Sequence, residues 1–216
     1  YIRMTHAIAF RKVKKDNIDE NCLAAWLRAG ELKARNIETK PFDKDKLVSV
    51  IPALRKLSTK SPTVYGPEIQ NLLAECGVAV VYLPYFKNTY VHGATRWLSP
   101  EKALVQLSLF LKWDDVFWFS LMHELGHIVK HGKKEEFLEF HSHSGTILED
   151  KEREADEFAQ KNLISEMEFD KLTGVAPEAI KALAVEIGIA PSIIAGRVAH
   201  EFSRKGNNDA WRHYSS

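Results

Sequence analysis

The sequence predicts an α+β fold in which helices pack on a small antiparallel sheet. Apolar residues recur every three to four positions before residue 78 and again from Asp114 onward, which is the period of a helix with one buried face. Between these regions, segments 78–84, 92–98 and 102–109 are rich in β-branched and aromatic residues, which favour strands. With 216 residues and 45% hydrophobic composition, the chain can bury a sizeable core.

Helices are expected before the sheet. Asp19 can cap the first helix, and the second follows Asp43. The Ser/Thr/Pro-rich stretch 58–67 then interrupts the pattern and opens a third helix. This stretch predicts a boundary between a helical N-terminal segment, residues 1–60, and a main domain, residues 61–216. The first helix would bury one face formed by Leu23, Trp26, Leu27 and Ala34.

After the sheet, helical spacing returns over four segments. Prolines at the start of the last two are typical of a first helical turn. The segments are approximately 114–131, 149–165, 177–187 and 191–203.

Charge and composition limit the classes of function. Thirty Lys and Arg residues nearly cancel 29 Asp and Glu residues, so charge alone would not hold nucleic acid or an anionic membrane. No apolar run approaches the roughly 20 residues that span a bilayer, and the amino end lacks the apolar centre of a secretory signal. Cys22 and Cys76 show no metal-type spacing and are expected to be free thiols. We therefore expect a cytoplasmic protein without membrane partners.

The segment FSLMHELGHIVKHG, residues 119–132, carries the chemistry. His123 and His127 are four positions apart, so on a helix they share one face and can bind one ion. Glu124 projects about 100° from His123 and can reach a water on that ion. This is the HExxH pattern of zinc hydrolases. Apolar neighbours would bury these groups, at a cost of several kcal/mol if they had no partner, and a metal removes that cost.

A third ligand must come from elsewhere. Lys133 stands where a third histidine of an extended motif would be, which excludes that class. His131 would lie about 12 Å along the helix axis from His123, whereas zinc–nitrogen bonds are about 2.0 to 2.1 Å long. We therefore interpret His131 as a polar residue near the end of the helix.

The acidic segment KEREADEFAQ, residues 151–160, offers a better source. Its apolar residues define an inward direction, and Glu152 falls within about 60° of it, whereas Glu154 falls about 100° away on the other side. Glu152 is therefore the predicted third ligand. Asp156, one turn later, could accept a hydrogen bond from the outer nitrogen of a ligand histidine. An ordinary charged surface helix is the alternative interpretation of this segment.

MHELGHIVKHG followed by KEREADEFA resembles the ImmA/IrrE family of zinc metallopeptidases. AAWLRAGEL, KPFDKDKL, GATRWLSPEKALVQLSL and GIAPSIIAGRVAHEF resemble the branch of that family that is fused to an N-terminal XRE-type helix-turn-helix, as in HigA-like antitoxins. The resemblance runs from about Ala7 to Phe202. The chain departs from many relatives at NLISEME, where they read L-[LM]-[IM]-P.

The resemblance implies a zincin-like, gluzincin type of fold and a zinc-dependent endopeptidase. It implies one Zn²⁺ per chain held by His123, His127 and Glu152, with Glu124 as the catalytic base. The substrate would be a regulatory protein, such as a repressor or a component of a toxin–antitoxin or stress-response system. The resemblance also implies that a DNA-binding domain precedes Tyr1, so DNA would be contacted only through that domain. A homodimer is possible.

Further site residues are expected around the metal. An extended substrate could add as a strand to an exposed sheet edge, for which the candidate is Gly93, Ala94, Thr95, Arg96 and Trp97. Tyr90, Arg197 and His200 are candidate hydrogen-bond donors to the oxyanion, and each has an ordinary structural role as its alternative.

Two other functions remain open on the sequence. The chain could be a non-catalytic module that keeps the fold to bind a partner or a ligand, although the intact Glu124 argues against this. It could also bind DNA directly, because LAVEIGIAPSIIAGRVA, residues 183–199, has the form of a helix-turn-helix with Gly188 at the turn. Its second helix offers almost only apolar residues, so we interpret the segment as a core-packing helix pair.

Overall fold

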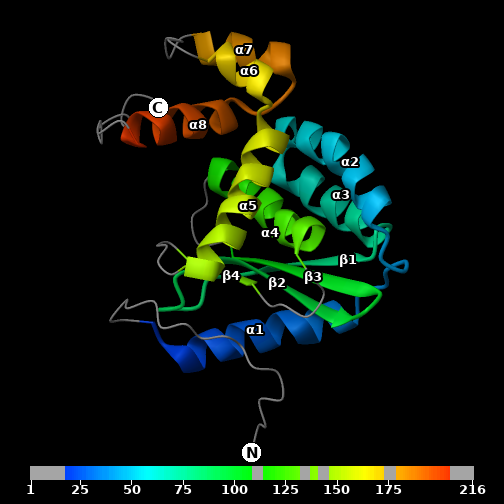
Figure 1. The fold of residues 1–216 in the computed structure, drawn as a ribbon. Helices are drawn as coiled ribbons and strands as arrows, with labels where there is room; N and C mark the ends of the chain where they lie inside the picture. Colours follow the sequence, from blue (N-terminus) through cyan, green and yellow to red (C-terminus); the bar gives the residue numbers. More distant parts are fainter. Residues whose placement is uncertain (1–17, 109–113, 132–136, 141–145, 173–178, 205–216) are drawn as a thin grey trace, which may run out of the picture.

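The computed structural model describes residues 18–108, 114–131, 137–140, 146–172 and 179–204, and it confirms the α+β class. Helices cover both faces of one sheet (Figure 1). Within the described residues, no single helix has the length and hydropathy needed to cross a bilayer. One pair of helices, Ile180–Ile187 and Pro191–Glu201, meets these two criteria only when taken together, and it is bent by 117°.

The sheet is mixed rather than antiparallel, so this part of the prediction is wrong. Its strand order is β1-β3-β2-β4. β2 and β3 form the expected hairpin, but β3 also pairs with β1 in parallel and lies inside the sheet. Both faces of β1 and β3 are buried, which is typical of parallel pairs covered by helices on each side. The strands are β1 (Val78–Leu83), β2 (Val91–Ser99), β3 (Lys102–Ser108) and β4 (Phe137–Phe140).

Helix α1 (Glu20–Arg35) covers one face of the sheet. Asp19 caps it as predicted, and the four residues expected on its inner face are all buried. Gly30 makes the close approach to the sheet, because a Cβ at this position would lie 1.8 Å from Oε1 of Gln106. Gln106 anchors the helix by donating a hydrogen bond from Nε2 to the carbonyl of Trp26 at 2.7 Å.

The opposite face of the sheet carries the larger core. Helices α2 (Lys44–Lys56), α3 (Pro62–Ala74), α4 (Asp114–Lys130) and α5 (Thr146–Leu163) lie over it, with a short 3-10 turn, η1 (Leu57–Thr59), after α2. Alternate residues of β1 separate the two cores, since Val78 and Val80 face this side and Ala79 and Val81 face α1. Helices on both sides of residue 60 join the larger core, and the predicted domain boundary there stays a prediction.

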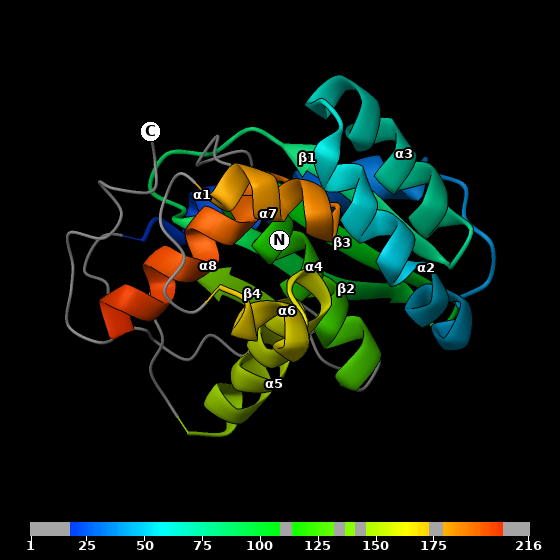
Figure 2. The same cartoon turned by 90° about the horizontal axis from the view of Figure 1, so that it is seen from above.

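Helices α6 (Glu166–Asp170), α7 (Ile180–Ile187) and α8 (Pro191–Arg204) lie on the far side of α4 and α5 from the sheet (Figures 1 and 2). Gly188, at φ 76°, allows the turn between α7 and α8. Ile193, Ile194 and Val198 of α8 are buried in the larger core. The interpretation of this segment as a core-packing helix pair is therefore confirmed.

Candidate metal centre

The two histidines of the HExxH segment lie together on α4 and point at a common position. Their side chains are 1% and 0% exposed, and their Nε2 atoms are 2.9 Å apart. Glu152 reaches the same position from α5, with Oε2 at 3.2 Å from Nε2 of His123 and Oε1 at 3.4 Å from Nε2 of His127. These three residues form the group within the described chain whose ligand atoms all lie within 4.8 Å of one another and could hold a metal ion.

Close packing of α4 on α5 brings Glu152 to the histidines. Gly126 lies between His123 and His127 in the sequence, and a Cβ there would be 3.1 Å from Cα of Ala155. The absence of a side chain lets the two helix backbones approach each other beside the cluster.

The spacing of the three side chains fits one divalent ion. Two nitrogens bound to zinc at about 2.05 Å in tetrahedral geometry are about 3.3 Å apart, and the observed separations of 2.9 to 3.4 Å bracket this value. Oε1 of Glu152 is buried, and its contact with Nε2 of His127, at 3.4 Å, is too long or poorly aligned for a good hydrogen bond. A buried carboxylate oxygen in this state is costly, and a cation at the centre would stabilise it.

The protonation states also suit a metal. Burial lowers the pKa of His127 to about 4, so its imidazole is neutral at pH 7. Burial would raise the pKa of Glu152, but hydrogen bonds with His123 and His127 outweigh it and lower that pKa to about 2. Neutral imidazoles and an ionised carboxylate are the forms that bind metal ions.

Glu124 is fully buried on the neighbouring face of α4, against strand β2. The hydroxyl of Thr95 donates a short hydrogen bond to Oε2 of Glu124 and lies 3.2 Å from its backbone oxygen. Gly93 leaves the space for this carboxylate, because a Cβ there would lie 2.4 Å from Oε1 of Glu124. Two residues of β2 therefore fix the orientation of Glu124.

The prediction that residues 93–97 form an exposed sheet edge is wrong. Strand β4 pairs with β2, setting Gly93 opposite Glu139, Ala94 opposite Leu138 and Thr95 opposite Phe137. The remaining two residues have structural contacts: Arg96 donates to the carbonyl of Leu27, and the ring of Trp97 packs edge-on against Phe42 at 4.8 Å. β4 has only four residues, too few for its alternation to stand out in the sequence.

The outer nitrogens of both histidines have partners. Nδ1 of His123 lies 2.8 Å from Oδ1 of Asp156, the contact considered for Asp156 on the sequence. Nδ1 of His127 lies 3.0 Å from Nδ1 of His131, which in turn contacts Glu154. The sequence interpretation gave His131 and Glu154 no such role. The available signal was the four-residue spacing of His127 and His131, which makes them neighbours on a helix.

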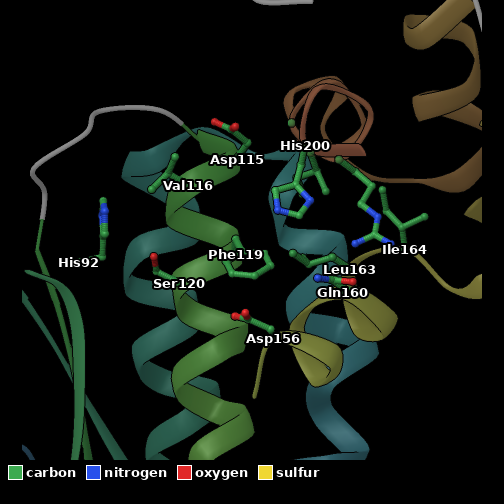
Figure 3. A pocket seen from close by; sticks show the side chains of 13 residues that line it. His92, Asp115, Val116, Phe119, Ser120, Asp156, Gln160, Leu163, Ile164 and His200 are labelled. Atoms are coloured by element: carbon green, nitrogen blue, oxygen red, sulfur yellow. The ribbon is translucent and has the colours of Figure 1, made fainter. Parts of the chain in front are cut away.

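A cavity of about 290 Å³ lies beside the cluster, between α4, α5, α8 and the start of β2 (Figure 3). Val116 and Phe119 of α4, Leu163 and Ile164 of α5, and Ile193 of α8 supply apolar lining. Asp156, which contacts His123, also lines the cavity, so the cavity adjoins the metal-binding group.

Polar side chains face the same cavity. Arg197 and His200, two of the three oxyanion candidates, line it, whereas Tyr90 is not among the lining residues. Arg197 also stacks over the ring of Phe169 at 4.6 Å and lies 3.4 Å from Glu201. His92 of β2 lines the cavity as well, and sequence analysis did not identify it.

A metal-binding group on an HExxH helix, completed by a glutamate of the next helix and backed by a small mixed sheet, defines a zincin-like fold. Residues 115–198 match the family model of the IrrE N-terminal-like domain, Peptidase M78. This segment belongs to the ImmA/IrrE family, as the sequence motifs suggested, and it contains His123, Glu124, His127 and Glu152. The family implies a metallopeptidase. No curated protein matches the chain.

Proposed function

We propose that this chain is a zinc-dependent endopeptidase that cleaves a specific regulatory protein in the cytoplasm, such as a repressor or a component of a toxin–antitoxin or stress-response system. The convergence of His123, His127 and Glu152 on one position, with Glu124 buried beside them, carries this proposal. The substrate class rests on the resemblance to the ImmA/IrrE family.

His123, His127 and Glu152 would hold the ion. Zinc supplies Lewis acidity, which polarises a peptide carbonyl and lowers the pKa of water. Glu124 accepts the proton of the attacking water and passes it to the departing amine. Thr95 supports this role by fixing one carboxylate oxygen, which restricts rotation of the group. Arg197, His200 and His92 supply candidate donors for the developing negative charge, because they line the adjoining cavity.

The substrate is an extended peptide that places one large apolar side chain in the cavity. The volume of the cavity, about 290 Å³, lies just below the range of pockets that hold whole small-molecule ligands, and it suits a single side chain. Among the described residues β4 ends the strand order next to β2, so its outer edge is the proposed place where the peptide adds as a strand.

Cleavage of regulators encoded next to this protein tests the proposal. The zinc-loaded wild type should cleave one of them, and a chelator should stop the reaction. Glu124→Gln should bind zinc equally well but cleave about 10²- to 10⁴-fold more slowly, the usual contribution of a general base. Equal cleavage by both proteins would remove Glu124 from the mechanism. If neither protein cleaves but both bind a regulator, the chain is a non-catalytic binding module.

A further inference from the structure

The two ligand histidines are held by different kinds of partner. His123 contacts the carboxylate of Asp156 directly, at 2.8 Å. His127 contacts another imidazole, that of His131, and Nε2 of His131 lies 3.1 Å from Oε2 of Glu154. A ring therefore separates His127 from its carboxylate, whereas none separates His123 from Asp156.

The proton positions along this second path follow from the chemistry of the site. A histidine that binds metal through Nε2 carries its proton on Nδ1, so His127 must donate from Nδ1. His131 must then accept at its own Nδ1 and carry its proton on Nε2. That proton points at Glu154, whose ionised carboxylate has no proton to donate and therefore accepts. Each nitrogen and oxygen of the path then has one consistent role.

We propose that His131 and Glu154 form a positioning relay that fixes the tautomer and ring orientation of His127 for metal binding. The proposal rests on the metal site proposed above. Neither residue belongs to the group that would hold the ion: His131 contacts His127 from one helical turn away, and Glu154 contacts the far nitrogen of His131.

The local fold builds this relay. The backbone N–H of His131 donates to the carbonyl of His127 at 3.0 Å, so the helical hydrogen bonding of α4 extends to His131 and sets the two rings one turn apart. The side chain of His131 is 4% exposed, so little water reaches it. The side chain of Glu154 is 53% exposed, and the relay therefore ends at solvent. The side chain of His127 itself is 0% exposed, so bulk solvent does not reach it to replace a lost partner.

Zinc affinity of four variants tests the relay. His131→Phe keeps a ring of similar size without nitrogens and should weaken zinc binding about 10- to 100-fold, the usual effect of losing such a partner. His131→Asn can place its side-chain oxygen near the position of Nδ1, accept from His127, and restore part of this loss. Glu154→Ala should weaken binding less than His131→Phe, because water can reach this exposed end.

Glu157→Ala is the matched control for Glu154→Ala. Glu157 lies on the same helix, is 55% exposed, and has an ion pair with Arg153 at 3.9 Å. It should leave zinc affinity unchanged. Affinity is measured by competition with a chromophoric chelator, and thermal unfolding of each metal-free variant shows that the fold is intact.

Nitrogen-15 NMR of the imidazoles in the zinc-loaded wild type gives a second, direct readout. It should show His127 protonated on Nδ1 and His131 protonated on Nε2. A folded His131→Phe variant with wild-type zinc affinity, or a His131 protonated on Nδ1, would overturn the relay and leave the metal site in place. A wild type that binds no zinc would overturn the metal site and the relay together.

Discussion

Replacing Gly93 with alanine should displace Glu124 without touching the metal ligands. The added Cβ would lie 2.4 Å from Oε1 and 2.9 Å from Cδ of Glu124. Normal van der Waals separation is about 3.5 Å, so the carboxylate must move by about 1 Å. A misplacement of this size costs about 10²-fold in rate, and the overpacking costs about 1 to 3 kcal/mol of stability.

Cleavage rate, zinc affinity and thermal unfolding of Gly93→Ala are compared with those of the wild type. Gly66→Ala is the control, because its Cβ would meet only an ordinary contact at 3.9 Å from Tyr82. We expect slow cleavage and unchanged zinc affinity for Gly93→Ala, and wild-type behaviour for the control. Wild-type cleavage by Gly93→Ala would show either that β2 does not position Glu124 or that Glu124 is not the proposed base.

Three further predictions concern the fold and the metal. Glu152→Ala should abolish stoichiometric zinc binding measured by metal analysis, and chelation should then no longer lower its melting temperature; a full zinc content would exclude Glu152 as a ligand. Gly30→Ala should evict the side chain of Gln106 and destabilise the protein by about 1 to 3 kcal/mol in denaturant unfolding, because its Cβ would lie 1.8 Å from that side chain. Burial would raise the pKa of Glu168, but the hydrogen bond from Arg55, at 2.7 Å, and those from Ser165 outweigh burial and lower this pKa. The ionised Glu168 therefore stabilises the fold above the usual carboxyl pKa, and this stabilisation is lost as pH falls through the lowered pKa. The stability advantage of the wild type over Glu168→Gln, about 1 kcal/mol or less because the group is partly exposed, should therefore shrink as pH falls below about 4.3; an advantage independent of pH would contradict this.

The metal-binding group could be predicted from the sequence because its geometry is local. The four-residue spacing of His123 and His127 places them together on any helix. Glu152 could be chosen over Glu154 because the apolar residues of its own helix define which side faces inward. The strand order had no such signal: nothing in residues 78–84 states that β3 will be their neighbour. Pairing between distant strands depends on how the whole chain covers the sheet.

The same helical geometry explains why the relay was missed. The axial distance from His123 excludes His131 as a ligand, but the distance that matters for the relay is one turn, from His127 to His131. Likewise, Glu154 lies on a side of α5 that does not face the metal-binding group, but on that side it contacts His131. A residue can thus act through its contact with a ligand histidine without being a ligand itself.

Strand β2 shows why small residues in a strand beside a helix have two structural interpretations. Gly93, Ala94 and Thr95 leave a backbone accessible, which suits an edge that receives a substrate. They also allow another element to approach closely, and here that element is the helix that carries Glu124. Sequence alone cannot separate the two, because both require a small side chain. The pairing of β4 decides between them: this strand occupies the open side of β2, so the small residues accommodate the carboxylate of Glu124 and do not form an edge that could receive a substrate.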